Sequence, residues 1–410
     1  MLKNAILQAA ARSTESVRRH RGHLHRHPEP SFSETRTGTY VSDALTALGI
    51  QHSTGWCADR GAAGIVAHLH GSESGTRHLA LRADMDALPI QEVDRPHAST
   101  VPGWMHACGH DAHTACLLGA AEVLNATREH WQGTIQLVFQ PGEETLPGGA
   151  SLMVAEGALA TDAPEAGPGS TGTQTVDGII GQHVYPQLDA GTVGFRSGPY
   201  MAAADELQIR IVGRGGHAAL PHRTVDPVVA AAHVITALQT VVSRSCDPTQ
   251  PAVLTFGKVS GGHARNVIPN EVVLDGTLRT YDESTAETLR AAIHRVAEST
   301  AAAFGARAEV DLAIGYPPVV NHPALTDQCR RQAEELLGAD RVVDLPLRMT
   351  GEDFSFYQKV VPGCFYRLGT GGDGPGCRSG LHTAEFDIDE AALETGTAMM
   401  AWLAATGSVG

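Results

Sequence analysis

The stretch MHACGHDAHT, residues 105–114, places three histidines, one cysteine and one aspartate within ten residues. Cysteine, histidine and carboxylate side chains are the ligands that suit zinc-like and manganese-like ions. His106 and His110 are four residues apart, but Gly109 lies between them and no Glu follows His106, so the helical His-Glu-x-x-His zinc pattern is absent. Cys108 and His110 would face different sides of a helix, whereas on a loop they could converge on one ion. A thiol nucleophile and a chance cluster, in a chain with 21 histidines, also stay open at this point.

Two adjacent carboxylates, Glu143 and Glu144, follow a stretch with the pattern of a buried strand, residues 134–141. Adjacent acids repel each other and usually mark a solvated loop. In α/β folds, however, functional sites lie just beyond the carboxyl ends of the core strands. One carboxylate could therefore bind a metal ion while the other acts as a base, and the residues alone leave both interpretations open.

Further acids and imidazoles follow other predicted strands. Asp84 and Asp86 end the stretch HLALRADMDAL, His183 ends the short strand GIIGQHV, and His382 follows a glycine-rich loop. A single histidine at a strand end is most often structural. Several such groups at the same end of one sheet favour a shared site.

Helix and strand patterns alternate through residues 1–199, and the predicted strands are almost continuously apolar. This pattern is typical of an α/β fold with a mostly parallel sheet sandwiched by helices. Residues 200–312 have the order β-α-β-β-α-β, the split βαβ (ferredoxin-like) sandwich, and residues 313–410 return to the α/β pattern. We therefore predict a catalytic domain in two parts, 1–199 and 313–410, with an inserted lid or dimerisation domain at 200–312. Residues 161–178, rich in Gly, Ser, Thr and Pro, are predicted to form a surface loop.

Composition limits the classes of function. A chain of 410 residues is too long for one ordinary core, and 42% hydrophobic with 18% charged residues is typical of globular proteins. The net charge of −15 argues against a nucleic-acid partner. No window approaches the roughly 18–20 apolar residues of a membrane span, and the N-terminus is a poor signal peptide. Seven scattered cysteines indicate free thiols in a reducing compartment, so we predict a cytoplasmic protein without a membrane partner.

Four histidines near the N-terminus could suggest a separate metal site: His20, His23, His25 and His27. We interpret them instead as part of a solvated helix face.

Eight motifs in this order resemble the dimetal amidohydrolases, a family that includes hippurate hydrolase, auxin–amino-acid conjugate hydrolases, aminoacylases and carboxypeptidases. The motifs are RHPEPSFSET, LRADMDALPIQE, MHACGHDAHT, FQPGEE, GRGGHAALPH, RNVIPN, MTGEDFSFY and LHTAEFDID. Each motif is weak alone, but the ordered set is specific and covers the chain from about His25 to its end.

The resemblance implies a role for each matching residue. Two divalent ions (Mn²⁺, Zn²⁺, Co²⁺ or Ni²⁺) would be bound by five ligands: Cys108, His110, Glu144, His183 and His382. Glu143 would be the general acid/base, and His217, reaching across a dimer, would polarise the substrate carbonyl. Asn266 and Arg279 would contact the substrate, and Asp86 would orient a ligand. Asp84, which replaces a metal-binding His of related peptidases, is left out of the ligand set.

The resemblance further implies hydrolysis of the amide bond of N-acyl amino acids or short peptides by a homodimer or homotetramer. Two alternatives from other classes stay open: a thiol hydrolase that uses Cys108 with His110 or His113, and a catalytically silent protein that binds acyl-amino acids or peptides. The loops before His183 and His382 are unusual for the family and could reshape the entrance to the site. The identity of the substrate is therefore the point that the resemblance supports least.

Overall fold

The computed structural model describes residues 1–161, 167–169 and 174–407. The chain forms two compact units. Unit 1 comprises Met1–Gly198, Val320–Pro346 and Asp353–Gly410, and unit 2 comprises Pro199–Val319 and Leu347–Glu352. Within the predicted loop 161–178, residues 162–166 and 170–173 lie outside the described part of the chain.

A mixed eight-stranded sheet forms the centre of unit 1, with the strand order β1-β2-β4-β3-β5-β16-β6-β15. The four neighbouring strands β4, β3, β5 and β16 run parallel, which confirms the predicted α/β fold with a large, mostly parallel sheet. The strands are β1 (Gln51–Trp56), β2 (Gly64–His70), β3 (Glu73–Asp84), β4 (Gln132–Gln140), β5 (Gly178–Asp189), β6 (Val193–Phe195), β15 (Val342–Asp344) and β16 (Gly363–Gly371). A separate two-stranded sheet pairs β7 (Gly198–Met201) with β14 (Val319–Asn321).

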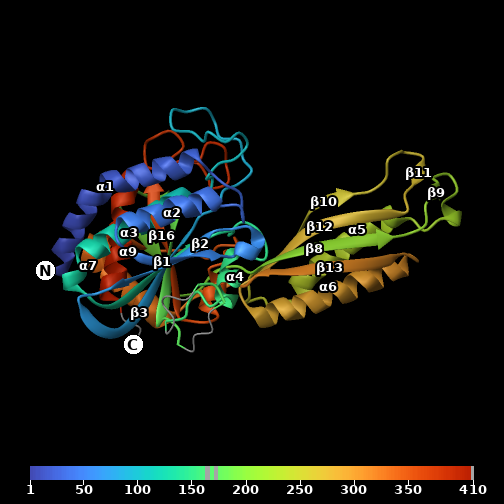
Figure 1. Ribbon diagram of the computed structural model, residues 1–410. Helices are drawn as coiled ribbons and strands as arrows, with labels where there is room; N and C mark the ends of the chain where they lie inside the picture. Colours follow the sequence, from blue (N-terminus) through green and yellow to red (C-terminus); the bar gives the residue numbers. More distant parts are fainter. Residues whose placement is uncertain (162–166, 170–173, 408–410) are drawn as a thin grey trace. The chain divides into compact units, whose positions relative to one another are not determined.

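Helices cover this sheet (Figure 1), and α1, α3 and α9 pack against one another. Nearly all of α3 is buried, because its sequence is rich in Ala, Leu and other small or apolar residues. The helices of unit 1 are α1 (Leu2–Arg26), α2 (Thr35–Ala47), α3 (His110–Ala126), α4 (Gly149–Ala155), α7 (Pro323–Leu337), α8 (Ser355–Gln358) and α9 (Ala391–Thr406).

The register of the parallel strands explains why polar groups meet at one edge of the sheet. Asp84, the last residue of β3, is paired with Gln140, the last residue of β4. Arg82 is paired with Gly181 of β5, so His183 lies at the level of Asp84, halfway along β5. The carboxyl ends of two strands and the middle of a third therefore place side chains at the same level.

Unit 2 is an antiparallel four-stranded sheet, in the order β10-β12-β8-β13, with two helices. The helices α5 and α6 contact each other, and both pack on strands of this sheet. The chain order β8-α5-β10-β12-α6-β13 is the split βαβ arrangement. The elements are β8 (Ala204–Val212), β9 (Gly216–His217), α5 (Pro227–Thr240), β10 (Ala252–Ser260), β11 (Val267–Ile268), β12 (Glu271–Thr280), α6 (Glu283–Ala303) and β13 (Arg307–Tyr316).

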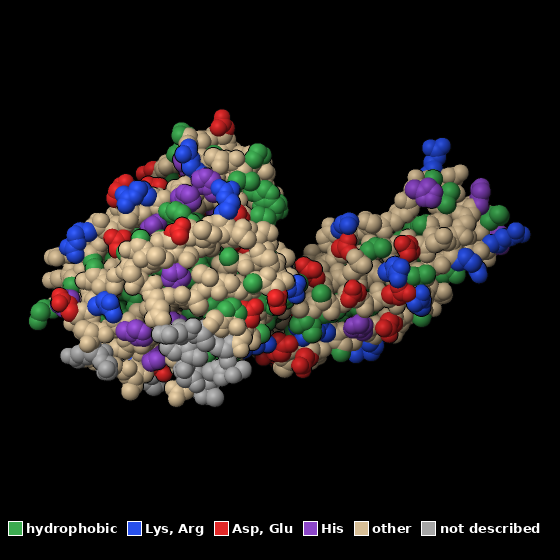
Figure 2. Space-filling model, viewed as in Figure 1, with side chains coloured by type: hydrophobic (Ala, Val, Ile, Leu, Met, Phe, Trp, Pro, Cys, Tyr) green, Lys and Arg blue, Asp and Glu red, His purple; other side chains and the backbone are tan. Residues whose placement is uncertain are grey.

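Acidic and basic side chains are interspersed over the face shown in Figure 2. Within the described residues, one helical stretch, Pro227–Ser245, is long and apolar enough by length and composition to cross a membrane. One helix of this kind is weak evidence for a membrane span, because one side of it packs against the sheet of unit 2 through Ala230, Val234 and Leu238.

The interpretation of the N-terminal histidines as a solvated face is wrong for His25, which is 1% exposed. Its ring nitrogens lie between two buried carboxylates: Nδ1 is 2.8 Å from Asp111 Oδ2 and Nε2 is 3.1 Å from Glu92 Oε1. Carboxylates only accept hydrogen bonds, so both ring nitrogens donate and His25 is an imidazolium. Burial and the neighbouring Arg21 act to lower the pKa of His25, but the hydrogen bonds to the two carboxylates outweigh them and raise it.

The stability of the metal-free protein should therefore depend on the protonation of His25. A raised pKa in the folded state means that His25 stabilises the fold fully below its ordinary pKa of 6.5, and that this contribution is lost as the pH rises through the folded-state value. We expect the free energy of unfolding, measured by urea denaturation with chelator present, to fall less steeply above pH 6.5 in His25→Gln than in wild type. Arg21, Glu92 and Asp111 face His25, and the rings of His97 and His106 lie near it.

A His27→Gln variant controls for the loss of a histidine from the same segment. Equal slopes in wild type and His25→Gln would contradict a charged His25.

Candidate metal centre

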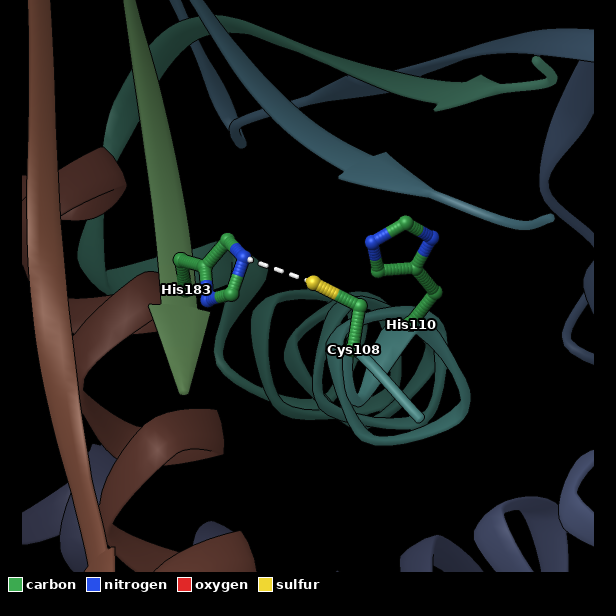
Figure 3. A group of neighbouring side chains, drawn as sticks. All are labelled: Cys108, His110 and His183. Carbon is green, nitrogen blue, oxygen red and sulfur yellow. Dashed lines mark hydrogen bonds between the residues drawn. The ribbon is translucent and has the colours of Figure 1, made fainter. Parts of the chain in front are cut away.

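The turn before α3 explains how Cys108 and His110 can face one centre although they are two residues apart. Gly109 has φ +83°, a left-handed conformation that a residue with a side chain rarely adopts. A Cβ at this position would also lie 2.5 Å from Val184 Cγ2. The chain therefore bends at Gly109, and the Cys108 sulfur lies between the rings of His110 and His183 (Figure 3).

Cys108 belongs to two groups of ligand atoms. In one group, the ligand atoms of Cys108, His110 and His183 lie within 4.8 Å of one another, and in the other those of Cys108, Glu144 and His382 do so. The Cys108 Sγ is 3.5 Å from His183 Nε2, and His382 Nε2 is 3.2 Å from Glu144 Oε1. The structure thus brings together all five residues predicted as ligands, with the thiol common to both groups. We call these five residues the candidate metal centre.

The hydrogen bonds of His110 and His183 leave a ring nitrogen of each directed at this centre. His110 Nδ1 lies 3.1 Å from Asp86 Oδ1, which accepts a hydrogen bond from it, so in the neutral ring Nε2 would carry the lone pair. That Nε2 is buried and has no hydrogen-bond partner among the described residues. His183 Nδ1 donates to the carbonyl oxygen of Val184 at 2.8 Å, so its Nε2 also carries a lone pair. A buried, unpartnered imidazole nitrogen beside a thiol and a carboxylate fits a divalent ion.

Two buried carboxyl groups hold the turn that carries Glu143 and Glu144. The backbone N–H of Gly142 donates to Glu34 Oε1 at 2.7 Å, and that of Glu144 donates to Asp86 Oδ2 at 2.9 Å. Burial, followed by the charge of Asp86, raises the pKa of Glu34 to about 8. Glu143 itself is 7% exposed, and one of its oxygens lies within 4.8 Å of ligand atoms of His110 and Glu144. Asp86 contacts both the ring of His110 and the backbone of Glu144.

Asp84 lies beside the centre, and each of its two oxygens already has a hydrogen-bond partner. Oδ2 accepts from Arg82 at 2.6 Å, and Oδ1 lies 2.6 Å from His113 Nδ1. The backbone N–H of Val184 donates to His113 Nε2 at 2.9 Å, so both nitrogens of His113 are also occupied. Although Asp84, His110 and His113 are close enough to form a metal-binding group, these contacts support leaving Asp84 out of the ligand set. They also leave His113 without a nitrogen that could serve as a base.

The carboxylate of Glu144 affects the pKa values of its two neighbours in the centre. Hydrogen bonding to Cys108 and then to Glu144 raises the pKa of His382 to about 10. Burial, followed by the charge of Glu144, raises the pKa of the Cys108 thiol. A potential that favours an imidazolium over a neutral imidazole also favours a divalent cation.

The remaining predicted residues lie in unit 2. His217, in β9, and Asn266, directly before β11, are both exposed and are neighbours, because the N–H of Ala218 donates to the carbonyl oxygen of Asn266 at 3.0 Å. Arg279 is half-buried in β12, and burial lowers its pKa.

Sequence reasoning missed the residues that join the segments of the candidate metal centre. Arg82 also donates to Gln140 Oε1 at 2.8 Å and to Asp353 Oδ1 at 2.8 Å, so it joins the ends of two strands to a third segment. The signal was available, because Arg82 interrupts the apolar stretch HLALRAD, and a charge inside a buried strand needs a buried partner. The partner Asp353 could not be identified from spacing.

Known proteins resemble this chain in sequence. A family model described as peptidase family M20/M25/M40 matches residues 80–406. The chain is 40% identical over 374 residues to N-acetyl-L-cysteine deacetylase of Bacillus subtilis, covering 91% of this chain and 83% of that protein. It is 38% identical over 392 residues to IAA-amino acid hydrolase ILR1-like 4 of Arabidopsis thaliana, covering 94% and 84% respectively.

A solved structure also resembles the whole chain. The YXEP protein of Bacillus subtilis, described as a dinuclear metal binding peptidase from the M20 family, superposes with a TM-score of 0.79 at 34% identity, covering 96% of this chain and 97% of that one. The similarity in sequence and in fold extends over both units. The chain therefore belongs to peptidase family M20/M25/M40, which confirms the resemblance that its ordered motifs predicted.

Proposed function

We propose that this protein is a metal-dependent amidohydrolase that cleaves the amide bond of N-acyl amino acids, releasing a carboxylic acid and an amino acid. The observation that carries the proposal is the arrangement at the end of the sheet. A thiol is shared by two groups of ligand atoms, and a second carboxylate, Glu143, lies beside the ligating one. The relatives named as a deacetylase of N-acetyl-L-cysteine and a hydrolase of IAA-amino acids support this class of substrate.

The two groups of ligand atoms support a pair of divalent ions. Cys108, His110 and His183 would hold one ion, and Cys108, Glu144 and His382 the other. Their thiolate, imidazole and carboxylate donors suit Mn²⁺, Zn²⁺, Co²⁺ or Ni²⁺, and ligand type alone does not select among these. When bound, such a pair supplies Lewis acidity and lowers the pKa of a water molecule.

The chain's own residues would move the proton and orient the substrate. Glu143 would accept a proton from the attacking water and donate it to the nitrogen of the leaving amine. His217 would donate to the carbonyl oxygen of a substrate in the partner's site, a role that its exposure in β9 allows. Asn266 lies next to His217, and the planar guanidinium of Arg279 suits the free carboxylate of an amino acid.

The thiol-hydrolase alternative is less well supported. A thiol nucleophile needs a lowered pKa and a base within reach, whereas burial and Glu144 raise the pKa of Cys108. Of its two predicted bases, His113 has both ring nitrogens hydrogen-bonded. His110 keeps Nε2 without a hydrogen-bond partner among the described residues, so the raised pKa of the thiol and the contacts of His113 are what count against this alternative. A silent binding protein, in turn, would have no use for Glu143 beside a ligating carboxylate.

We further propose that the protein is a homodimer formed through unit 2. Residues 227–243 carry no Asp, Glu, Lys or Arg, yet Val228 and Val229 of α5 are 48% and 45% exposed. The neighbouring helix α6 exposes charged residues instead, among them Glu287 and Arg295. Strand β10, on which α5 also packs, is an edge of its sheet and has backbone groups available for pairing with a second strand.

Removing the metal should abolish turnover. We expect hydrolysis of a panel of N-acetyl and N-benzoyl amino acids to stop after treatment with a chelator and to return when Mn²⁺, Co²⁺ or Zn²⁺ is added. A thiol enzyme would keep its activity under the same treatment. An absence of turnover across the panel, with metal shown to be bound, would support the silent binder.

The adjacent carboxylates should separate catalysis from metal binding. We expect Glu143→Gln to lower kcat by about 100- to 10,000-fold while the bound metal, measured by elemental analysis, stays at the wild-type amount. The matched variant Glu144→Gln should lose metal as well as activity. If Glu143→Gln retained wild-type turnover, the assignment of the base would be wrong.

A charge on the exposed face of α5 should disrupt the dimer. We expect Val229→Glu to shift the protein toward the monomer in analytical ultracentrifugation, because a carboxylate buried in an interface lacks a partner. Thr288→Glu, at an exposed position of α6, is the matched control and should leave the mass unchanged. A monomeric wild-type protein would refute this part of the proposal.

A further inference from the structure

We propose that Arg21 is a positioning residue for the candidate metal centre, because it holds the segment that carries His382 against the segment that carries Cys108 and His110. The inference rests on the proposed function, since it takes His382 to be a ligand. Arg21 itself contacts none of the proposed ligands. It acts from behind the centre, through two carboxylates that each follow a ligand closely in the sequence.

The guanidinium of Arg21 lies between these two carboxylates. Its Nε donates to Asp111 Oδ2 at 3.0 Å and its NH2 donates to Asp387 Oδ1 at 2.6 Å. Asp111 directly follows His110 at the start of α3, and Asp387 lies five residues after His382. Because the side chain of Arg21 is 5% exposed and those of its partners are 1% and 8% exposed, water screens these contacts little.

The segment around His382 needs such support. His382 has φ +61°, a left-handed conformation that is uncommon for a residue with a side chain. Such a conformation persists only when the surrounding structure imposes it. The N–H of His382 donates to the carbonyl oxygen of Ala107 at 2.9 Å, and the ring of His382 hydrogen-bonds to Cys108. Both contacts join the two segments at His382 itself. Arg21 supplies a further connection, five residues beyond His382.

The support comes from a rigid element. Arg21 belongs to α1, a helix of 25 residues that packs against both α3 and α9. Asp387 is held further by Arg95, whose NH1 donates to Oδ2 at 2.8 Å, and by His97, whose Nε2 lies 2.7 Å from the same oxygen. These contacts fix Asp387, but only Arg21 among the described residues donates to both Asp111 and Asp387.

Removal of Arg21 would break the bridge between Asp111 and Asp387. His25 would still contact Asp111, and Arg95 and His97 would still contact Asp387. No group among the described residues would then join the two carboxylates, so the segment of His382 would be held less firmly against the start of α3. The group of Cys108, Glu144 and His382 would then loosen, whereas that of Cys108, His110 and His183 would keep its geometry. A positioning role therefore predicts the selective weakening of one of two ions.

The test is titration of the chelator-treated, full-length protein with Co²⁺, followed by its visible absorption and by calorimetry. We expect wild type to bind two Co²⁺ ions, and Arg21→Met to bind one of them at least about tenfold less tightly with the other unchanged. Arg21→Lys keeps the positive charge, so it serves as the test variant if Arg21→Met does not fold. One ammonium lacks the fork that reaches both carboxylates, so the same weakening is expected in this variant.

Arg77→Met is the matched control. Arg77 lies near the other end of β3 from Asp84 and donates to the carbonyl oxygens of Ala405, Gly407 and Gln132. Its loss removes several hydrogen bonds from the same unit without touching the candidate metal centre. Wild-type binding of both ions is expected in this variant. Binding of both ions with wild-type affinity in a folded Arg21→Met or Arg21→Lys protein would overturn the proposal.

A second measurement separates failure of this inference from failure of the proposed function. In the metal-free protein, hydrogen exchange of backbone amides over residues 376–390 should be faster in Arg21→Met than in wild type or Arg77→Met. If wild type binds no Co²⁺, the proposed function falls and this exchange measurement alone decides the positioning role. Unchanged exchange in Arg21→Met would overturn it.

Discussion

Buried negative charge at one edge of the central sheet is the constraint on which the candidate metal centre depends. A carboxylate removed from water is costly unless it is paired and hydrogen-bonded. Asp84 is paired with Arg82 and His113, and Asp86 accepts from Ser31 and from the backbone of Glu144. These partners come from different elements of unit 1. Satisfying the charges therefore also sets the relative positions of the strands and helices that carry the proposed ligands.

Much of this arrangement could be predicted from the sequence, because it follows from local patterns. Apolar strands alternating with helices indicated a mostly parallel sheet, and the carboxyl ends of parallel strands meet at one edge. That rule already placed Glu143 and Asp84 near each other before any resemblance was considered. The ordered motifs then supplied the family. The convergence of Cys108 and His110 needed one further feature, the left-handed backbone at Gly109, which a glycine at that position permits but does not require.

The supporting residues could not be predicted, since their partners are distant in the sequence. Asp353 is 271 residues from Arg82, and Asp387 is 366 residues from Arg21. The prediction for His25 failed for the same reason. Its place on a helix rich in Arg and His indicated a solvated face, and only the fold shows that it is buried between two carboxylates. A charged residue in a sequence is expected at the surface until its partner is known.

The exclusion of Asp84 from the ligand set has a consequence for the proposed pair of ions. Both oxygens of Asp84 are hydrogen-bonded, one to Arg82 and the other to His113. Without Asp84, five protein ligands are proposed for two ions. Each ion can then have three protein ligands only if the two ions share one of them. Cys108 is the residue common to both groups of ligand atoms. Three protein ligands leave an ion an open position for water or substrate, as catalytic rather than structural sites require. Sharing of Cys108 by the two ions would therefore make up for the absence of Asp84 from the ligand set.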